Sequence, residues 1–170
     1  MFWSKLMIFI MAAATLGLPH ASSAAEPEKL NVLGTEMILK IDSHKTGGVM
    51  SVVESVVQPG SGPPKHVHTR EDELFYVLQG TFKIWRGDDI LEVGEGAVAF
   101  LPRDVPHTYQ NIGESPGRLL AIITPGGFDG FFREVSSKNL SAPRDMEELT
   151  KIAGQFGLQF LGPPPAKPAN

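Results

Sequence analysis

Short runs of strand-forming residues, separated by turns rich in glycine and proline, recur along most of the chain and constrain its fold more than any other feature. β-branched and aromatic residues favour strands, whereas Gly, Pro, Asn and Asp between them favour turns. The expected strands cover residues 36–41, 49–57, 73–79, 81–85, 90–93, 97–101, 107–111 and 118–124. Many short strands at regular spacing predict an all-β barrel or sandwich. Because the sequence shows no internal repeat, we expect one barrel.

The C-terminal part of the chain changes from strand-like to helical sequence. Residues 128–135 and residues 143–153 predict two short helices, the second with Ser141 as its N-cap or Pro143 at its first turn. An apolar stripe at helical spacing consists of Met146, Leu149, Ile152 and Ala153. Such a stripe covers a barrel or forms a dimer contact, so a homodimer is one hypothesis. The proline-rich residues 161–170 predict an extended or disordered tail.

The first 25 residues have the layout of a secretory signal peptide. Lys5 gives a positive start, residues 6–18 form an uncharged apolar run, and residues 22–25 are small. The apolar run is shorter than the roughly 20 residues of a membrane-spanning helix, which leaves a retained anchor as the alternative. We expect cleavage after Ala24 or Ala25. The mature protein would then be periplasmic or secreted from a bacterium, without stable membrane insertion.

Residues 26–170 are expected to form one mature domain, long enough for a proper core. Its expected parts are an N-terminal arm at 26–36, a β core at about 36–125, a helical extension at 126–160 and the proline-rich tail. The full chain has 15 Lys and Arg against 19 Asp and Glu, a net charge of −4, and loss of Lys5 with the leader makes it −5. Without a basic cluster, nucleic acid is not an expected partner. Cysteine is absent, so any metal must be bound through nitrogen and oxygen.

Three of the five histidines gather near one acidic residue. His20 lies in the leader and His44 lies in a turn-like stretch, which leaves His66, His68 and His107. On an extended chain, residues at i and i+2 point to the same side and lie about 6.7 Å apart along the strand. The Gly-Ser-Gly-Pro-Pro segment before His66 favours such an extended conformation over a helix. Two imidazoles placed in this way can bind one metal ion.

The spacing around the histidine pair resembles the first motif of the cupin superfamily. Gly60 is followed by five residues, then His66 and His68, then four residues, Glu73, six residues and Gly80. The resemblance implies one cupin barrel, that is, a double-stranded β-helix or jelly roll, with short C-terminal helices added to it. Residues 75–80 and 124–128 are similar to single-domain cupins likened to quercetin dioxygenases.

A second segment resembles the second cupin motif, Gly-x5-Pro-x-Gly-x2-His-x3-Asn. Gly96, Pro102, His107 and Asn111 fill its positions, and fifteen residues separate the two motifs, as in small bacterial cupins. Asp104 stands where the family usually has glycine. Because Asp tolerates the left-handed conformation better than most residues, we expect the turn to persist.

The resemblance predicts a metal site formed by His66, His68, Glu73 and His107. Three imidazoles and one carboxylate suit one divalent Fe, Mn, Ni, Co, Cu or Zn ion, and ligand identity alone does not choose among them. Glu73 is either a ligand throughout or, as credited to the matching residue of quercetinase-like cupins, a catalytic base as well.

The side chains beside the predicted site suggest an apolar cavity for a small-molecule substrate. By strand alternation Phe75 shares the face of Glu73, and Tyr109 shares the face of His107. Phe100 is expected to face inward as well. These three aromatic residues are candidates for substrate binding, with ordinary core packing as the alternative.

The leading functional hypothesis is an exported dioxygenase-type oxidoreductase that acts on a small phenolic or enolisable molecule. One alternative is a lyase or isomerase that uses the metal as a Lewis acid. The other is a binding protein for a metal or small ligand, without catalysis. The sequence names neither the substrate nor the metal.

Overall fold

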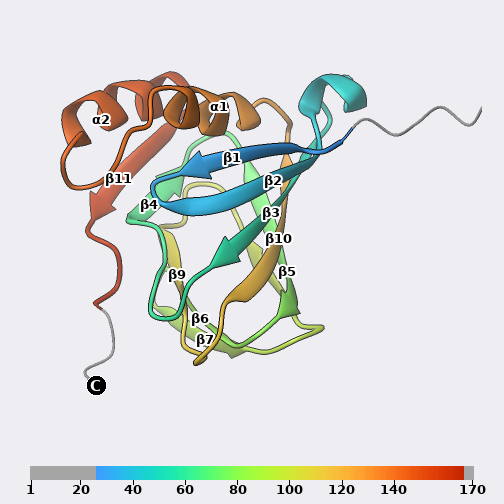
Figure 1. Cartoon of the computed structure of the whole chain (residues 1–170), viewed down its shortest axis with the longest axis vertical. Helices are drawn as coiled ribbons and strands as arrows, with labels where there is room; N and C mark the ends of the chain where they lie inside the picture. Colours follow the sequence, from blue (N-terminus) through green and yellow to red (C-terminus); the bar gives the residue numbers. More distant parts are fainter. Residues whose placement is uncertain (1–25, 167–170) are drawn as a thin grey trace, which may run out of the picture.

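The computed structural model describes residues 26–166, which form two antiparallel sheets facing each other, with two helices over one end (Figure 1). The first sheet contains β1 (Glu28–Val32), β2 (Thr35–Ile41), β3 (Ser51–Val57), β10 (Gly117–Thr124), β5 (Asp72–Gln79) and β8 (Val98–Leu101), in that spatial order. The second contains β11 (Leu158–Gly162), β4 (Lys65–His68), β9 (His107–Asn111), β6 (Phe82–Arg86) and β7 (Asp89–Val93). This arrangement confirms the predicted all-β double-stranded β-helix.

Strand alternation places the apolar residues of both sheets in the space between them. On β5, Phe75 and Val77 are buried whereas Tyr76 is exposed, as expected for a strand with one face inward. One apolar cluster fills the closed end of the barrel around Phe82 and Ile84, and a second lies beneath the helices around Phe131 and Leu149. Each fully buried side chain of this size stabilises the fold by about 1.5–3 kcal/mol.

The expected N-terminal arm is instead a strand. β1 forms a hairpin with β2, in the register Glu28↔Leu39 to Val32↔Thr35. The sequence prediction was wrong here because an edge strand with polar, exposed residues lacks the apolar alternation by which strands are recognised. The hairpin extends the first sheet beyond the predicted core of residues 36–125.

Both C-terminal helices are present, and they belong to the core of this chain. α1 is Asp129–Ser137 and α2 is Met146–Gln155. Ser141 does not cap α2, because the segment from Ala142 to Asp145 is a turn in which the Ser141 N–H donates to the Asp145 carboxylate. The stripe residues Leu149, Ile152 and Ala153 are at most 1% exposed, packed in the cluster beneath the helices. The stripe therefore covers the barrel.

The predicted helical extension also contains a strand. β11 follows α2 and pairs with β4, in the register Leu158↔His68 and Phe160↔His66. Sequence analysis missed it because five residues between a helix and a proline run give too little alternation to recognise. Residues 163–166 continue without regular structure, and residues 167–170 of the predicted tail lie outside the described residues.

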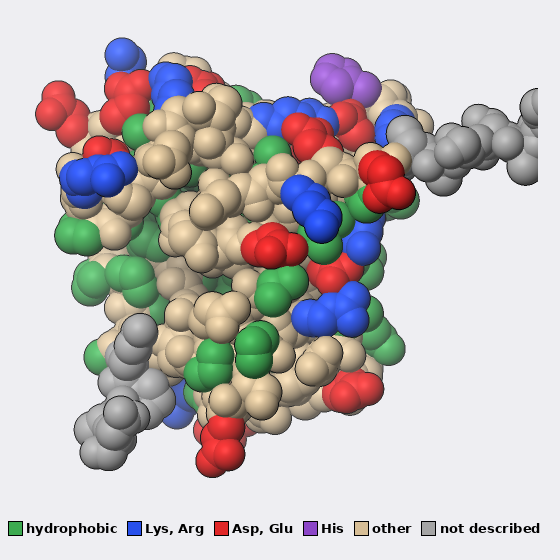
Figure 2. Space-filling model, viewed as in Figure 1, with side chains coloured by type: hydrophobic (Ala, Val, Ile, Leu, Met, Phe, Trp, Pro, Cys, Tyr) green, Lys and Arg blue, Asp and Glu red, His purple; other side chains and the backbone are tan. Residues whose placement is uncertain are grey.

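Two further expectations concern the environment of the chain. The predicted signal peptide, residues 1–25, lies outside the described residues. No helix within residues 26–166 is long and apolar enough to cross a membrane. Acidic and basic side chains are interspersed over the face of the molecule that Figure 2 shows.

Candidate metal centre

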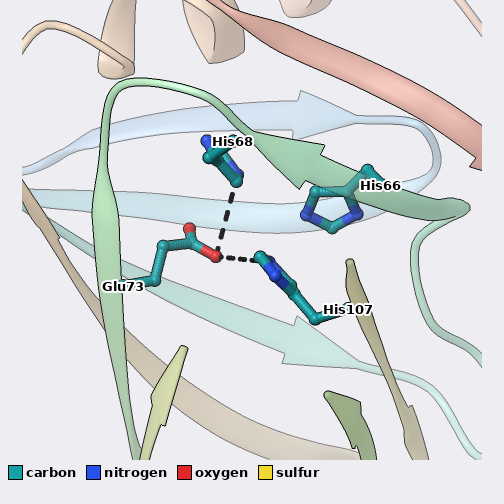
Figure 3. A group of neighbouring side chains, drawn as sticks. All are labelled: His66, His68, Glu73 and His107. Carbon is teal, nitrogen blue, oxygen red and sulfur yellow. Dashed lines mark hydrogen bonds and ion pairs between the residues drawn. The ribbon is translucent and has the colours of Figure 1, made fainter. Parts of the chain in front are cut away.

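The four predicted ligands converge between the two sheets. His66 and His68 lie on β4, His107 begins β9 directly opposite His66, and Glu73 reaches across from β5 in the other sheet. Their candidate ligand atoms all lie within 4.8 Å of one another, and all four side chains are buried. Figure 3 shows the three rings and the carboxylate directed at a common point. The predicted convergence is confirmed.

The segment before β4 is shaped to bring its histidines against β9. A Cβ on Gly62 would lie 1.8 Å from the Tyr109 carbonyl oxygen, so only glycine allows the two backbones to approach this closely. Pro63 and Pro64 then keep the chain extended into β4, and their carbonyl oxygens accept hydrogen bonds from Thr108 and His66.

Each imidazole is held by its Nδ1 atom, which leaves Nε2 for a metal. His66 Nδ1 lies 2.8 Å from the Pro64 carbonyl oxygen, and His107 Nδ1 lies 2.9 Å from the Val105 carbonyl oxygen. A carbonyl oxygen can only accept, so Nδ1 carries the proton in both rings. With the proton on Nδ1, the Nε2 lone pair is the available ligand. The tautomers therefore fit metal binding.

His68 is held by a carboxylate that sequence analysis did not identify. Its Nδ1 lies 3.3 Å from Glu71 Oε2, and both side chains are buried. A carboxylate that accepts from the far nitrogen of a ligand histidine is a recurring feature of metal sites. The signal was Glu71, one of two carboxyl residues between His68 and Glu73, but the run Arg-Glu-Asp-Glu gave no reason to expect that its first glutamate is buried.

Electrostatics in the cluster favours the forms that bind a cation. Burial lowers the pKa of His66 to about 3, with a further contribution from the neighbouring His107 and His68, so this ring is neutral near pH 7. Burial would raise the pKa of Glu73, but the charges of the histidines and the hydrogen bond from His107 outweigh it and hold the pKa at about 2.

A hydrogen bond joins His107 to the Glu73 carboxylate through atoms that a metal ion could bind. Burial would lower the pKa of His107, yet the hydrogen bond and charge of Glu73 raise it. His107 Nε2 lies 3.0 Å from Glu73 Oε2, and His68 Nε2 lies 3.7 Å from the same oxygen. A divalent cation bound to these atoms would place a positive charge beside the carboxylate, in the position of the present contact between His107 and Glu73. The donor set and its charge therefore fit a metal.

The turn before His107 tolerates the unusual residue of the second motif. Asp104 has φ 62°, the left-handed conformation that glycine would adopt most easily. Its N–H donates to the His68 carbonyl oxygen at 2.7 Å, which joins the turn to β4. The expectation that Asp104 keeps this turn is confirmed.

A cavity of about 150 Å³ adjoins the cluster, with His66, His68 and Glu73 in its wall. Phe75 and Tyr109 line it from the barrel interior, as the strand alternation predicted. Burial raises the pKa of the Tyr109 hydroxyl, although a hydrogen bond with Ser55 opposes this. Phe128 lies on the opposite side, with its ring edge-on to His68 at 4.3 Å between centroids. Sequence analysis did not select Phe128, because the chain places it outside both motifs.

The expectation for Phe100 was wrong. Its side chain is 50% exposed and points away from the site, because Ala99 and Leu101 are the buried residues of β8. Because side chains alternate along a strand, only every second residue of β8 faces inward. Leu101 is paired with Glu73 and faces inward, so Phe100 next to it faces outward. Phe100 therefore cannot contact a substrate bound in the cavity.

Comparison with known proteins agrees with this geometry. The model of the cupin domain family matches residues 53–123, the segment that contains all four candidate ligands. The chain contains a cupin domain. Within solved structures, an RmlC-like cupin from Shewanella frigidimarina has a TM-score of 0.54 at 20% identity, over 65% of this chain and 95% of that chain. At that identity the likeness shows the cupin fold alone.

Curated relatives match this chain over part of their own length. Over 83 residues the chain is 35% identical to protein SchB of Streptomyces halstedii, which covers 47% of this chain and 56% of SchB. Over 117 residues it is 25% identical to quercetin 2,3-dioxygenase of Bacillus subtilis, which covers 68% of this chain and 34% of the dioxygenase. The chain thus spans less than two thirds of the length of these relatives, and it resembles quercetin dioxygenase-like cupins in its cupin domain.

Proposed function

We propose that this cupin is a metal-dependent enzyme of the dioxygenase type, acting on a small phenolic or enolisable molecule. The observation that carries the proposal is the orientation of three imidazoles and one carboxylate toward a common point beside an apolar cavity. The similarity to a quercetin 2,3-dioxygenase supports the reaction class. A metal-dependent lyase or isomerase and a non-catalytic binding protein are the alternatives that the experiments below separate.

His66, His68, Glu73 and His107 would hold the metal. Nitrogen and oxygen donors of this kind suit Mn, Fe, Co, Ni, Cu and Zn. When bound, such an ion supplies a Lewis acid and, if redox-active, a route for electrons. The protein positions the donors from two facing sheets, excludes bulk water by burial, and presents an apolar wall against which a substrate can be oriented.

Glu73 has a second proposed role as the base that accepts the acidic proton of the substrate. Its carboxylate lies in the cavity wall, where a substrate oxygen can approach it. Glu73→Gln keeps an oxygen that can coordinate but cannot accept the proton at neutral pH. We expect metal affinity within about tenfold of wild type and a loss of turnover of about 10²- to 10⁴-fold. Equal turnover of the variant and the wild type would remove the base role from Glu73 and leave its ligand role.

The metal is tested by dialysis against each candidate ion, followed by elemental analysis of the protein. We expect one ion per chain in the wild type and loss of most of it in His66→Ala, His68→Ala and His107→Ala. His44→Ala is the matched control, because His44 is exposed on the 3-10 helix Ser43–Thr46, outside the cluster. Full metal content in all three variants would contradict the site.

Catalysis is tested by dioxygen uptake with the protein loaded in turn with Fe, Mn, Co, Ni and Cu. The substrate panel contains single-ring phenols, other enolisable molecules and a flavonol. Uptake that depends on both metal and substrate is the expected result. Its absence across the panel, with metal bound, would favour the lyase, isomerase or binding alternatives.

We also propose that the protein is exported, because residues 1–25 carry the charge and apolar pattern of a signal peptide. Cleavage after Ala24 or Ala25 would leave β1, which begins at Glu28, intact. N-terminal sequencing of fractionated protein should find Ala25 or Glu26 first. A chain that still begins with Met1 would instead favour an anchor or an internal protein.

A further inference from the structure

The cavity beside the metal centre is enclosed by aromatic side chains from opposite sides. Phe75 and Tyr109 belong to the barrel interior and meet edge to face, with 5.4 Å between their ring centroids. Phe128 and its neighbour Phe131 face them from the helical side, stacked at 5.1 Å. A flat ring in this cavity would therefore lie among aromatic side chains, the contacts that aromatic molecules prefer.

The volume of the cavity is that of one ring. It measures about 150 Å³, whereas sites for drug-sized ligands are roughly 300–1,000 Å³. A cavity of about 150 Å³ in another protein, lined by apolar side chains, accommodates benzene. A flavonol has three rings, so a cavity of this volume would not take up the whole molecule.

The helical wall is tied in place at both ends. Arg133 of α1 forms ion pairs with Glu28 of β1, with Asp42 at the end of the hairpin, and with Asp129. At the cavity itself, the Phe128 ring contacts His68 directly. Moving the helical wall outward therefore means separating α1 from the hairpin or moving a ligand histidine.

Apart from the metal-binding residues, the described cavity wall has no side chain that could pair with a charged group on a ligand. Among the described residues that line the cavity, none is Lys or Arg, and the ionisable ones are limited to the ligands and Tyr109. Ser55, Thr35 and Tyr109 supply hydroxyl groups. A charged group buried against phenylalanine without a partner is strongly disfavoured.

We propose that this cavity selects a single-ring phenol or enol that carries no charge apart from the oxygen directed at the metal, and that it excludes three-ring flavonols. The proposal rests on the proposed function for the metal contact, and it narrows the substrate class of that site. The proposed substrate differs from the one named for the quercetin dioxygenase relative, although this chain and that relative share the cupin domain.

Three probes test size and charge separately by calorimetric titration of the zinc-loaded protein. Zinc is redox-inert, so binding is measured without turnover. Catechol is the single ring, 3,4-dihydroxybenzoate adds one carboxylate to the same ring, and 3-hydroxyflavone is the flavonol. We expect 3,4-dihydroxybenzoate and 3-hydroxyflavone to bind at least tenfold more weakly than catechol. Equal or tighter binding of 3-hydroxyflavone would overturn the size limit, and equal binding of the benzoate would overturn the charge limit.

Variants identify the wall that sets the limit. Phe128→Ala should reduce the preference for catechol over 3-hydroxyflavone at least tenfold. Because Phe128 is 3% exposed and its loss weakens the core, Phe160→Ala, which enlarges the same cavity from a half-buried position, is the second variant. Phe100→Ala is the matched control, since its ring is exposed on the outer face of β8. A preference unchanged in both cavity variants, or changed equally in the control, contradicts the proposal.

Failure of the proposed function remains distinguishable from failure of the size limit. Elemental analysis shows first whether the protein binds metal. The same titrations on metal-depleted protein then isolate the cavity, where the preference for catechol over 3-hydroxyflavone should persist because it depends on volume. Loss of the preference in this form overturns the size limit, whatever the metal experiments show.

Discussion

At the scale of single residues, the metal centre depends on the acceptors behind the imidazoles. Pro64 and Val105 hold two rings through backbone carbonyl oxygens, whereas His68 depends on the side chain of Glu71. A backbone acceptor cannot be removed by substitution, but a side-chain acceptor can. Glu71 is therefore the residue at which ring orientation can be tested apart from the ligands themselves.

Glu71→Ala should lower metal affinity about 10- to 100-fold, the usual effect of removing the partner of a ligand histidine. Glu71→Gln should restore much of it, because the amide oxygen still accepts from Nδ1. Glu95→Ala, at an exposed position, is the control. Competition with a chelator of known affinity gives the measurement, and a Glu71→Ala protein that binds metal as tightly as the wild type would disprove the orienting role.

Residue-scale predictions from sequence succeeded where the backbone alone decides the outcome. The i, i+2 spacing of His66 and His68 placed both rings on one side of β4. Sequence analysis failed for Phe100, because the pairing of β8 with β5 decides which residues of β8 face inward. A pattern of four residues does not reveal that pairing. Glu71 was missed for a similar reason, since its burial follows from the tight connection between β4 and β5.

At the scale of elements, the N-terminal hairpin and α1 form one unit fastened by Arg133. The Arg133 side chain is 31% exposed, and its guanidinium contacts three carboxylates, of which Asp129 is 1% exposed. Exposed ion pairs contribute roughly 0–1 kcal/mol, but a buried carboxylate deprived of its partner costs about 3–5 kcal/mol. The contact with Asp129 therefore dominates the contribution of this cluster to stability.

Arg133→Met should reduce the free energy of unfolding by about 3 kcal/mol near pH 7, because it leaves Asp129 buried without its cation. Arg144→Met is the matched control, since Arg144 is 67% exposed and its pair with Asp145 should contribute less than about 1 kcal/mol. Urea denaturation of both variants gives the comparison. A loss of unfolding free energy no greater than that of the control would show that the cluster contributes no more than an exposed ion pair.

The same cluster predicts a pH dependence. Burial would raise the pKa of Asp42, but hydrogen bonds from His44 and Arg133 and the charge of Arg133 lower it below its ordinary value. A carboxyl with a depressed folded-state pKa stabilises the fold above its unfolded pKa of about 3.9, and this is lost as pH falls through the folded pKa. The stability difference between wild type and Arg133→Met should therefore shrink below about pH 4. A difference that grows on acidification would contradict this assignment.

At the scale of the whole molecule, β11 returns the chain from the helices to the sheet that carries the histidines. Sequence analysis predicted the barrel from its internal strands and motifs, but it could not predict this closure, because the pairing of β11 with β4 joins residues about ninety positions apart. β4 has β9 on one side and β11 on the other. Without β11, the strand that bears His66 and His68 would become an edge of its sheet.

A truncation that ends at Gly157 tests whether the closing strand supports the metal centre. It removes the backbone partner of β4 and the buried Leu158, together with Phe160 in the cavity wall. Burial of a side chain such as Leu158 stabilises a fold by about 1.5–3 kcal/mol, and the half-buried Phe160 adds less, so we expect a lower melting temperature and weaker metal binding.

A truncation that ends at Gly162 is the matched control, because it removes the tail and keeps β11. The described part of that tail accepts hydrogen bonds from the Lys65 N–H at the Pro163 carbonyl oxygen and from the Gln110 side chain at the Ala166 carbonyl oxygen, and Pro164 lies in the cavity wall. A bond of that kind contributes about 0.5–1.5 kcal/mol, so this truncation should retain most of the stability and the metal. If the shorter chain does not fold, Leu158→Ala gives the same comparison within an intact strand. Equal melting temperatures and equal metal affinities for the two truncations would show that the barrel holds its histidines without the returning strand.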